Sequence, residues 1–440
     1  MKTLSFKDII TLGFLNLALF VGAGNIIFPP FIGYMAGTNV IPAAIGFLLT
    51  GVGLPILTAI AMGPVEGSMT RIMSPMGRVL SILVIVSCYL FAGPLGAIPR
   101  AATVAYDLAV LPFIGDNVPW GGSIYYPLFF LLTILAASYP QKLFNIVGQF
   151  LTPVKIIALA LLCATVFVLP VIVSAPKGAY INEPFSQGIV QGYLTMDTFA
   201  SLIFGVILVN AVRSRGVTDI GLTTRYIVYS AIIAGIGLIC LYLCLFRLGR
   251  VNVEVASAIN ATNGAQVLSS YIAYHFGIMG KILVAFLITI ACLVASIGVL
   301  SSASLYFNEL TGISYRFYIW TFGIIATLIS NLGLTKLIDM SVPILQAIYP
   351  VLIIVIVTSF FYKRMKNPSL IVVPASLLGF YFGLADAFKT QAIDLKVFSF
   401  AQHFPLVEHG LGWLVPCALL IAICAIFDAL FSKKKISNAI

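Results

Sequence analysis

The sequence has 440 residues, of which 61% are hydrophobic and only 9% are charged, and its mean hydropathy is +1.10. A water-soluble domain of this size would expose most of those apolar side chains, so that class is excluded and the chain is an integral membrane protein. The net charge of +10 is spread over many loops, which argues against nucleic-acid binding and indicates basic residues that set membrane topology.

The first apolar stretch, residues 9–35, is interrupted by the segment Val21-Gly22-Ala23-Gly24-Asn25-Ile26-Ile27-Phe28-Pro29-Pro30. Glycine permits unusual backbone conformations and proline lacks an N–H donor. Within a bilayer, unwound backbone is tolerated only where protein or a wet cavity satisfies it. The segment therefore predicts a broken helix whose freed amides bind an anion such as a carboxylate, with a proline-kinked helix as the alternative. We expect this helix to be retained, since the segment lacks a small-residue signal-peptide cleavage site.

Eleven further apolar runs follow, and a span needs about 20 residues, so we expect about twelve transmembrane helices in one polytopic domain, residues 1–440. Most lysines and arginines fall in loops on the side of the N-terminus, so both termini are expected in the cytoplasm. The runs cover about 39–63, 77–106, 124–139, 143–173, 192–212, 222–246, 276–307, 314–330, 340–362, 369–387 and 409–431.

The sixth run, 192–212, also carries small polar residues, and it has a glycine, Gly205, in mid-span. It enters the membrane from the side opposite to the first run. Two interrupted helices at corresponding places in two halves of opposite orientation are typical of an inverted-repeat transporter, with the site where the breaks meet. We therefore expect repeats of five helices each at 1–175 and 190–365, and two additional helices in 366–440.

Other function classes find little support in the sequence. The seven cysteines lie in apolar spans, where they behave as small hydrophobes. No span gathers the carboxylates or histidines that a membrane-embedded enzyme needs, and no polar stripe or repeated filter loop indicates a channel. We expect a transporter and not an enzyme, with a small-molecule substrate and the bilayer as partners, no cofactor and no obligate protein partner; an enzyme or channel stays the alternative of another class.

Several long motifs resemble the branched-chain amino acid:cation symporter family, and the likeness runs nearly end to end. The family has the leucine-transporter fold, which implies an all-α membrane protein with sodium-driven uptake of leucine, isoleucine and valine across a bacterial cytoplasmic membrane. The motifs are Gly22-Ala23-Gly24-Asn25-Ile26-Ile27-Phe28-Pro29-Pro30, Gly93-Pro94-Leu95-Gly96-Ala97-Ile98-Pro99-Arg100, Gly192-Tyr193-x-Thr195-Met196-Asp197-x-x-Ala200-x-Leu202-x-Phe204-Gly205 and Val209-Asn210-Ala211-x-Arg213-Ser214-Arg215-Gly216.

The resemblance also implies a substrate site. The amides of the first break would hold the substrate carboxylate, Ser201 would accept from the α-ammonium, and Phe204, with Gly205 making room, would contact the aliphatic side chain. One methylene in such a pocket discriminates by only about 1–3 kcal/mol, so selectivity among the three amino acids should be broad. The substrate-binding residues expected on this basis are Gly22, Ala23, Gly24, Asn25, Ser201, Phe204 and Gly205.

For the sodium ion, the resemblance implies carbonyl oxygens of the first and eighth helices, with hydroxyl groups completing the shell. Here the sequence departs from the family, because Val294 and Ala295 stand where a threonine pair is expected. Proton-coupled or exchange transport of another apolar amino acid is the alternative, and a basic group at Lys155 offers a stand-in for the cation. The expected sodium-site residues are Ala18, Val21, Ala291, Val294, Ala295 and Ser296.

Three charged residues, Arg100, Asp107 and Asp197, are expected in the outer halves of their helices. Charge is costly in lipid, so each is a functional candidate. They could form an ion pair at an outer gate, or extend toward the lipid headgroups, and the second interpretation is the preferred one.

Overall fold

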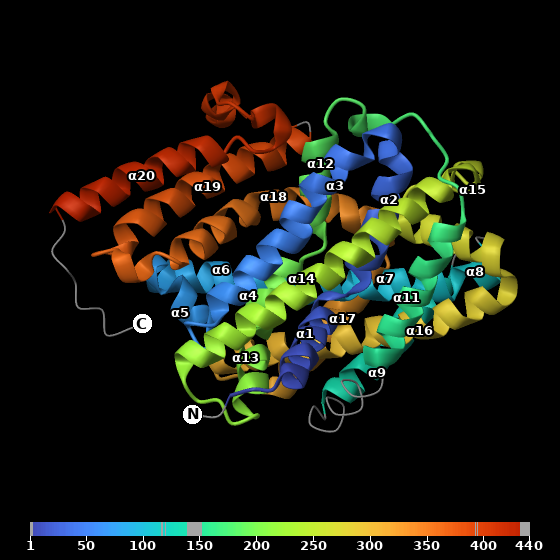
Figure 1. Cartoon of the computed structure of the whole chain (residues 1–440), viewed down its shortest axis with the longest axis horizontal. Helices are drawn as coiled ribbons and strands as arrows, with labels where there is room; N and C mark the ends of the chain where they lie inside the picture. Colours follow the sequence, from blue (N-terminus) through green and yellow to red (C-terminus); the bar gives the residue numbers. More distant parts are fainter. Residues whose placement is uncertain are drawn as a thin grey trace.

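The computed structural model describes residues 3–115, 118, 120–138, 152–391, 393 and 395–431, and over these residues it is helical without strands. Most long helices run roughly side by side, from the lower left to the upper right of Figure 1. Every predicted span contains at least one described helix, which confirms the all-α membrane architecture. The helices are α1 (Phe6–Phe20), α2 (Ala23–Ala36), α3 (Val40–Leu48), α4 (Leu54–Met62), α5 (Met69–Met73), α6 (Gly77–Ala92), α7 (Ala97–Ala109), α8 (Leu111–Ile114), α9 (Gly121–Ala137), α11 (Thr152–Val168), α12 (Pro184–Leu194), α13 (Asp197–Arg213), α14 (Ile220–Val251), α15 (Val253–Ala258), α16 (Gly264–Thr311), α17 (Tyr315–Ser330), α18 (Leu334–Ser359), α19 (Pro368–Thr390) and α20 (Leu414–Phe431).

The first span is a broken helix, as predicted, but the break is shorter than the sequence suggests. The side chain of Ser5 accepts a hydrogen bond from the Asp8 amide and starts α1. Only Val21 and Gly22 are non-helical, and α2 resumes at Ala23. The double proline lies inside α2 and does not belong to the break, because neighbouring protein can satisfy the carbonyls that proline leaves free.

The sixth span is also broken, and here the predicted position was wrong. α12 starts at Pro184, well before residue 192, and the helix breaks at Thr195 and Met196. Met196 has a left-handed backbone (φ 60°), which separates α12 from α13. Gly205 lies within continuous α13, so it does not interrupt the helix.

One further span differs from its expected course. The third is divided between α6 and α7 by the glycine-rich segment 93–96. The eighth span keeps its predicted start near 276, because α16 consists of two helices that meet at the non-helical Gly277 (φ 56°), and the second helix follows this residue. The predicted repeat boundaries at 175 and 190 and at 365 stay predictions.

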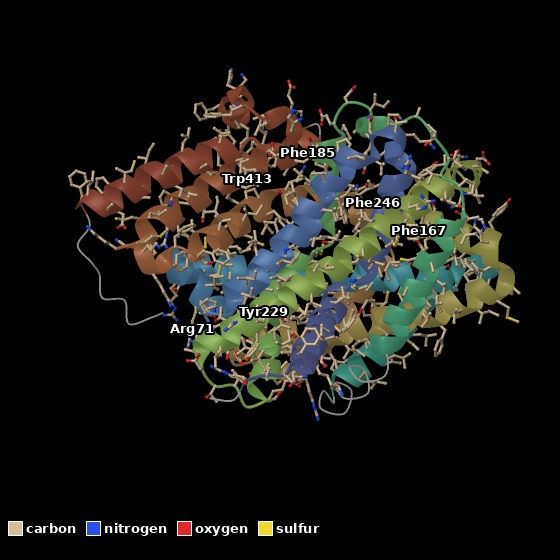
Figure 2. The ribbon with its side chains drawn as sticks, in the orientation of Figure 1. Arg71, Phe167, Phe185, Tyr229, Phe246 and Trp413 are labelled. Carbon is tan, nitrogen blue, oxygen red and sulfur yellow. The ribbon has the colours of Figure 1, made fainter. Side chains whose placement is uncertain are left out.

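The second half of the broken first helix, α2, lies inside the bundle, where α14 packs closely along it. A Cβ on Gly33 would lie 2.0 Å from the Phe246 carbonyl oxygen, and one on Gly249 would lie 2.0 Å from that of Pro30. Phe246 is near one end of α14 and Tyr229 near the other, on the side of Arg71 (Figure 2). At the edge of the bundle, α18, α19 and α20 stack in order (Figure 1).

Candidate functional site

A cavity of about 240 Å³ lies where the breaks of the first and sixth spans meet. α16 and the start of α7 complete its wall. The structure thus joins the two breaks in one site, as the sequence predicts. The lining residues are Leu15 and 18–25 of α1 and α2, Ala92, Ala97, Ile98, Arg100 and Ala101 of α6 and α7, 195–197, Ala200, Ile203, Phe204 and Ile207 around α13, and Ala291 and 294–299 of α16.

The start of α2 forms the polar end of the cavity. The Gly22 amide already donates to Oδ1 of Asn25 over 2.9 Å, so it is not free for a ligand. Ala23 and Gly24 are the first residues of α2, and the first amides of a helix have no intrahelical acceptor. The predicted anion site therefore narrows to the amides of Ala23 and Gly24, and Asn25 serves as a cap.

Asn25 also connects the two breaks through a buried polar cluster. Its Nδ2 donates to Oδ2 of Asp197 and to the hydroxyl of Tyr242, each over 2.5 Å. The Tyr242 hydroxyl lies 3.3 Å from the same carboxylate oxygen and donates to it. All three side chains are buried. The sequence marked Asp197 as a charged residue in a span, but nothing in it distinguished Tyr242 from other tyrosines in apolar runs.

Arg100 bonds to the backbone at the second break, between α12 and α13. Its guanidinium donates to the carbonyls of Leu194 and Thr195 at the end of α12, the latter over 3.3 Å, and it lies 5.4 Å from the centre of the Phe28 ring. The side chain is 3% exposed, so the interpretation that it extends to the headgroups was wrong. Among the described residues no ion pair within 4 Å joins it to an acid, so the alternative of a gate ion pair is not seen either, and the guanidinium bonds to carbonyls. Asp107 is half-buried near the end of α7.

One face of α13 supplies the apolar wall. Ala200, Ile203, Phe204 and Ile207 line the cavity, at the i, i+3, i+4 and i+7 spacing of a helix face. The predicted contribution of Phe204 to this wall agrees with its position.

Ser201 and Gly205 do not line the cavity. The Ser201 hydroxyl donates to the Pro55 carbonyl over 2.9 Å, and a Cβ on Gly205 would meet the side chain of Met62 at 2.7 Å. Both residues face α4, so the geometry does not favour the expected bond between Ser201 and a substrate ammonium.

We therefore expect Ser201→Ala to leave leucine affinity within about twofold of the unmodified protein, because the hydroxyl points away from the cavity. Losing the hydrogen bond to the Pro55 carbonyl should lower the free energy of unfolding by about 1 kcal/mol. Titration of the purified variant with leucine, followed by its melting curve, measures both quantities. A large loss of affinity with an unchanged melting curve would return Ser201 to the substrate site.

The six residues expected around a cation all line the cavity, so α1 and α16 meet there as predicted. Carbonyls 18–20, at the end of α1, lack intrahelical amide donors. Ser296 carries the one side-chain oxygen among the α16 residues of the lining. Its hydroxyl is buried and has no hydrogen-bond partner within the described part of the chain. Lys155 belongs to α11, but its side chain lies outside the described structure.

Ion pairs join the elements at the end of the bundle where α1 begins. Glu66, between α4 and α5, bonds to Arg71 and Arg213, and these two arginines lower the pKa of Glu66. Nε of Arg215 lies 3.7 Å from Oδ1 of Asp8 at the start of α1. All of these side chains are at least a quarter exposed, and exposed pairs contribute little stability. Such contacts can break and reform at small cost.

The fold matches solved transporters. The nucleobase-cation-symport-1 family transporter Mhp1, closed with bromovinylhydantoin bound, aligns with a TM-score of 0.57 and 12% identity over 97% of this chain and 94% of its own. MhsT in complex with L-phenylalanine aligns with a TM-score of 0.50 and 17% identity over 94% of this chain and 98% of its own. These similarities confirm the predicted leucine-transporter fold.

Sequence relatives cover nearly the whole chain. The branched-chain amino acid permease BrnQ of Escherichia coli K12 is 44% identical over 436 residues, which is 98% of each protein. The branched-chain amino acid transport system 3 carrier protein of Pseudomonas aeruginosa is 43% identical over 439 residues, 98% of this chain and 99% of its own. A family model described as branched-chain amino acid transport protein matches residues 5–431. The chain therefore belongs to this family of multi-pass membrane transporters.

Proposed function

We propose that the protein imports leucine, isoleucine and valine across the cytoplasmic membrane of a bacterium, by sodium symport. The observation that carries this proposal is the cavity between the two helix breaks, which has a polar end at the start of α2 and an apolar wall on α13. A branched-chain amino acid has the same division between a charged backbone and an apolar side chain. The names of the relatives, which are permeases and carriers of branched-chain amino acids, support the same substrate class.

In this proposal the substrate carboxylate binds the amides of Ala23 and Gly24, where the helix dipole favours an anion. The aliphatic side chain then lies against Ile203, Phe204 and Ile207. Alternating access moves one group of helices against another around this fixed site. The exposed ion pairs of Glu66 and Asp8 would open and close at one end of the bundle, and the excess of basic residues supports a cytoplasmic position for that end.

The coupling ion in this proposal is sodium, bound between the end of α1 and the middle of α16. Sodium needs oxygen ligands, and carbonyls near Ala18, Val21 and Ala291 with the Ser296 hydroxyl can provide them. The burial of an unpartnered hydroxyl at Ser296 supports a polar ligand beside it. Coupling to protons, or exchange of one amino acid for another, is the alternative.

Uptake of radiolabelled leucine into proteoliposomes, measured under a sodium gradient, a proton gradient and no gradient, tests the function. We expect accumulation above equilibrium with inward sodium, and competition by isoleucine and valine. Accumulation driven only by a proton gradient would mean that the coupling ion is the proton and not sodium. Failure of all three amino acids to enter under any gradient would refute the substrate class.

Phe204→Ala should weaken the binding of leucine and isoleucine by about 30-fold and that of alanine by less than about threefold, because only the larger side chains reach the lost ring. Dissociation constants for the three amino acids measure this split. Val206→Ala on the outer face of the same helix is the matched control, since Val206 is exposed outside the cavity. Equal losses for all three ligands would mean that Phe204 supports the helix instead.

A further inference from the structure

Two buried residues of opposite charge, Arg100 and Asp197, line the same small cavity. They are 3% and 2% exposed, and α7 and the start of α13 carry them. A buried charge without an ionic partner is costly, and more so in a membrane. Such a pair at the edge of a cavity indicates a ligand that carries both charges.

The Arg100 guanidinium stands beside the start of α2. A Cβ on Gly24 would lie 3.2 Å from Nη2 of Arg100 and 3.3 Å from Cα of Thr195. Nη1 and Nη2 donate to the carbonyls of Leu194 and Thr195, while Nε is buried and has no partner among the described residues. The two carbonyls therefore fix the orientation of the guanidinium and leave the Nε–H group without a partner.

The carboxylate of Asp197, at the start of α13, bonds to Asn25, which is the residue after Gly24. Asn25 and Tyr242 both donate to the same carboxylate oxygen, Oδ2. The Thr195 hydroxyl donates to the Gly192 carbonyl over 2.9 Å and also lies within reach of the Asp197 carboxylate. No ion pair within 4 Å joins Asp197 to a basic side chain in the described part of the chain. The charge of Asp197 is therefore positioned by hydrogen bonds, and Arg100 acts on it only from beyond ion-pair distance.

We propose that Arg100 and Asp197 bind the two charged groups of the transported amino acid. Nε of Arg100, with the amides of Ala23 and Gly24, holds the α-carboxylate, and Asp197 accepts from the α-ammonium through Oδ1. Gly24 is next to Arg100, and the following residue, Asn25, is bonded to Asp197, so both charged residues lie beside the start of α2 at the same end of the cavity.

This assignment rests on the proposed function and adds two specificity-determining residues to it. It also replaces Ser201, which faces α4, as the partner of the ammonium. The aliphatic side chain would leave the charged end toward Phe204, so the same cavity selects both the zwitterion and the apolar side chain.

The test combines two variants with three ligands: L-leucine, L-leucinol, which lacks the carboxylate, and (S)-2-hydroxy-4-methylpentanoate, which lacks the ammonium. Dissociation constants are measured on the purified, reconstituted protein by competition and by shifts in melting temperature. Asp197→Asn should weaken leucine by about 30-fold but the hydroxy acid by less than about threefold. Arg100→Gln should weaken leucine and the hydroxy acid by about 30-fold but leucinol by less than about threefold.

Asp197→Asn keeps an oxygen for Asn25 and Tyr242, so the fold should survive. If Arg100→Gln does not fold, Arg100→Lys is the substitute variant. Lysine keeps a positive charge and a donor for the carbonyls, but it has no Nε–H group for the ligand. Matched controls are Asp386→Asn, a buried acid outside the cavity, and Arg247→Gln, whose guanidinium bonds to the carbonyls of Val166 and Leu169.

The assignment is supported if each variant weakens only the ligands that carry the group it no longer binds. That group is the ammonium for Asp197→Asn and the carboxylate for Arg100→Gln. Equal weakening of all three ligands by either variant, or equally large losses in the controls, would overturn it while leaving leucine transport in place. If the unmodified protein binds no leucine at all, the proposed function fails first and the assignment fails with it.

Discussion

Replacing Gly24 by valine is expected to remove leucine binding. A Cβ at this position would lie 3.1 Å from the Phe28 ring, 3.2 Å from the Arg100 guanidinium and 3.3 Å from Thr195. A branched side chain would therefore occupy the space in which the carboxylate meets the start of α2. Losing two hydrogen bonds to a charged group lowers affinity by about 100-fold or more. Leucine titration of the purified variant measures the loss.

Gly22→Ala is the matched control for this prediction. A Cβ on Gly22 would have only the Asn25 Oδ1 at 3.5 Å and the Phe20 carbonyl oxygen at 3.8 Å as close neighbours, so it fits without displacement. We expect Gly22→Ala to keep leucine affinity within about threefold, since the amide of Gly22 is already bonded to Asn25. A folded Gly24→Val protein with unmodified affinity would contradict the carboxylate site, and Gly24→Ala provides a smaller change if valine prevents folding.

The sequence was sufficient for the architecture because that depends on long patterns. A run of about 20 apolar residues has one stable form in a bilayer, a helix, so each predicted span contains one. The position of a break depends on local contacts instead. Gly205 looked like an interruption, but α13 is continuous there and packs against Met62. The real break at Met196 depends on a left-handed residue and on Arg100 bonding to the carbonyls before it.

The sequence predicted only the part of the site that follows from residue type and helical spacing. The backbone of the first break and the face of α13 follow from glycine and from helical spacing, and these residues meet in the cavity. Which side of α13 faces the cavity is set by α4, and the Pro55 carbonyl turns Ser201 away from it. The contacts of Asn25 with Asp197 and Tyr242 join residues 172 and 217 positions apart, a separation that no local pattern records.

Sodium dependence should be weak in the unmodified protein and should rest on one hydroxyl. Val294 and Ala295 bring no side-chain oxygen to the cavity, so Ser296 is the side-chain ligand that α16 can offer beside the carbonyls at the end of α1. We expect Ser296→Ala to raise the sodium concentration needed for half-maximal leucine uptake by about tenfold, and Ala295→Thr to lower it by about tenfold. Uptake into proteoliposomes over a series of sodium concentrations measures both.

The leucine affinity at saturating sodium is the control, because neither change touches the charged end of the cavity or the wall at Phe204. Ala295→Val is the matched control for Ala295→Thr, since valine has nearly the shape of threonine without the oxygen. A gain of sodium dependence in Ala295→Thr but not in Ala295→Val would assign the effect to the added hydroxyl. Tight sodium dependence that neither Ser296→Ala nor Ala295→Thr alters would place the ion elsewhere along α16. Uptake that ignores sodium and stops in Lys155→Ala would instead favour the ammonium of Lys155 as the stand-in for the cation, and leave α16 without a role in coupling.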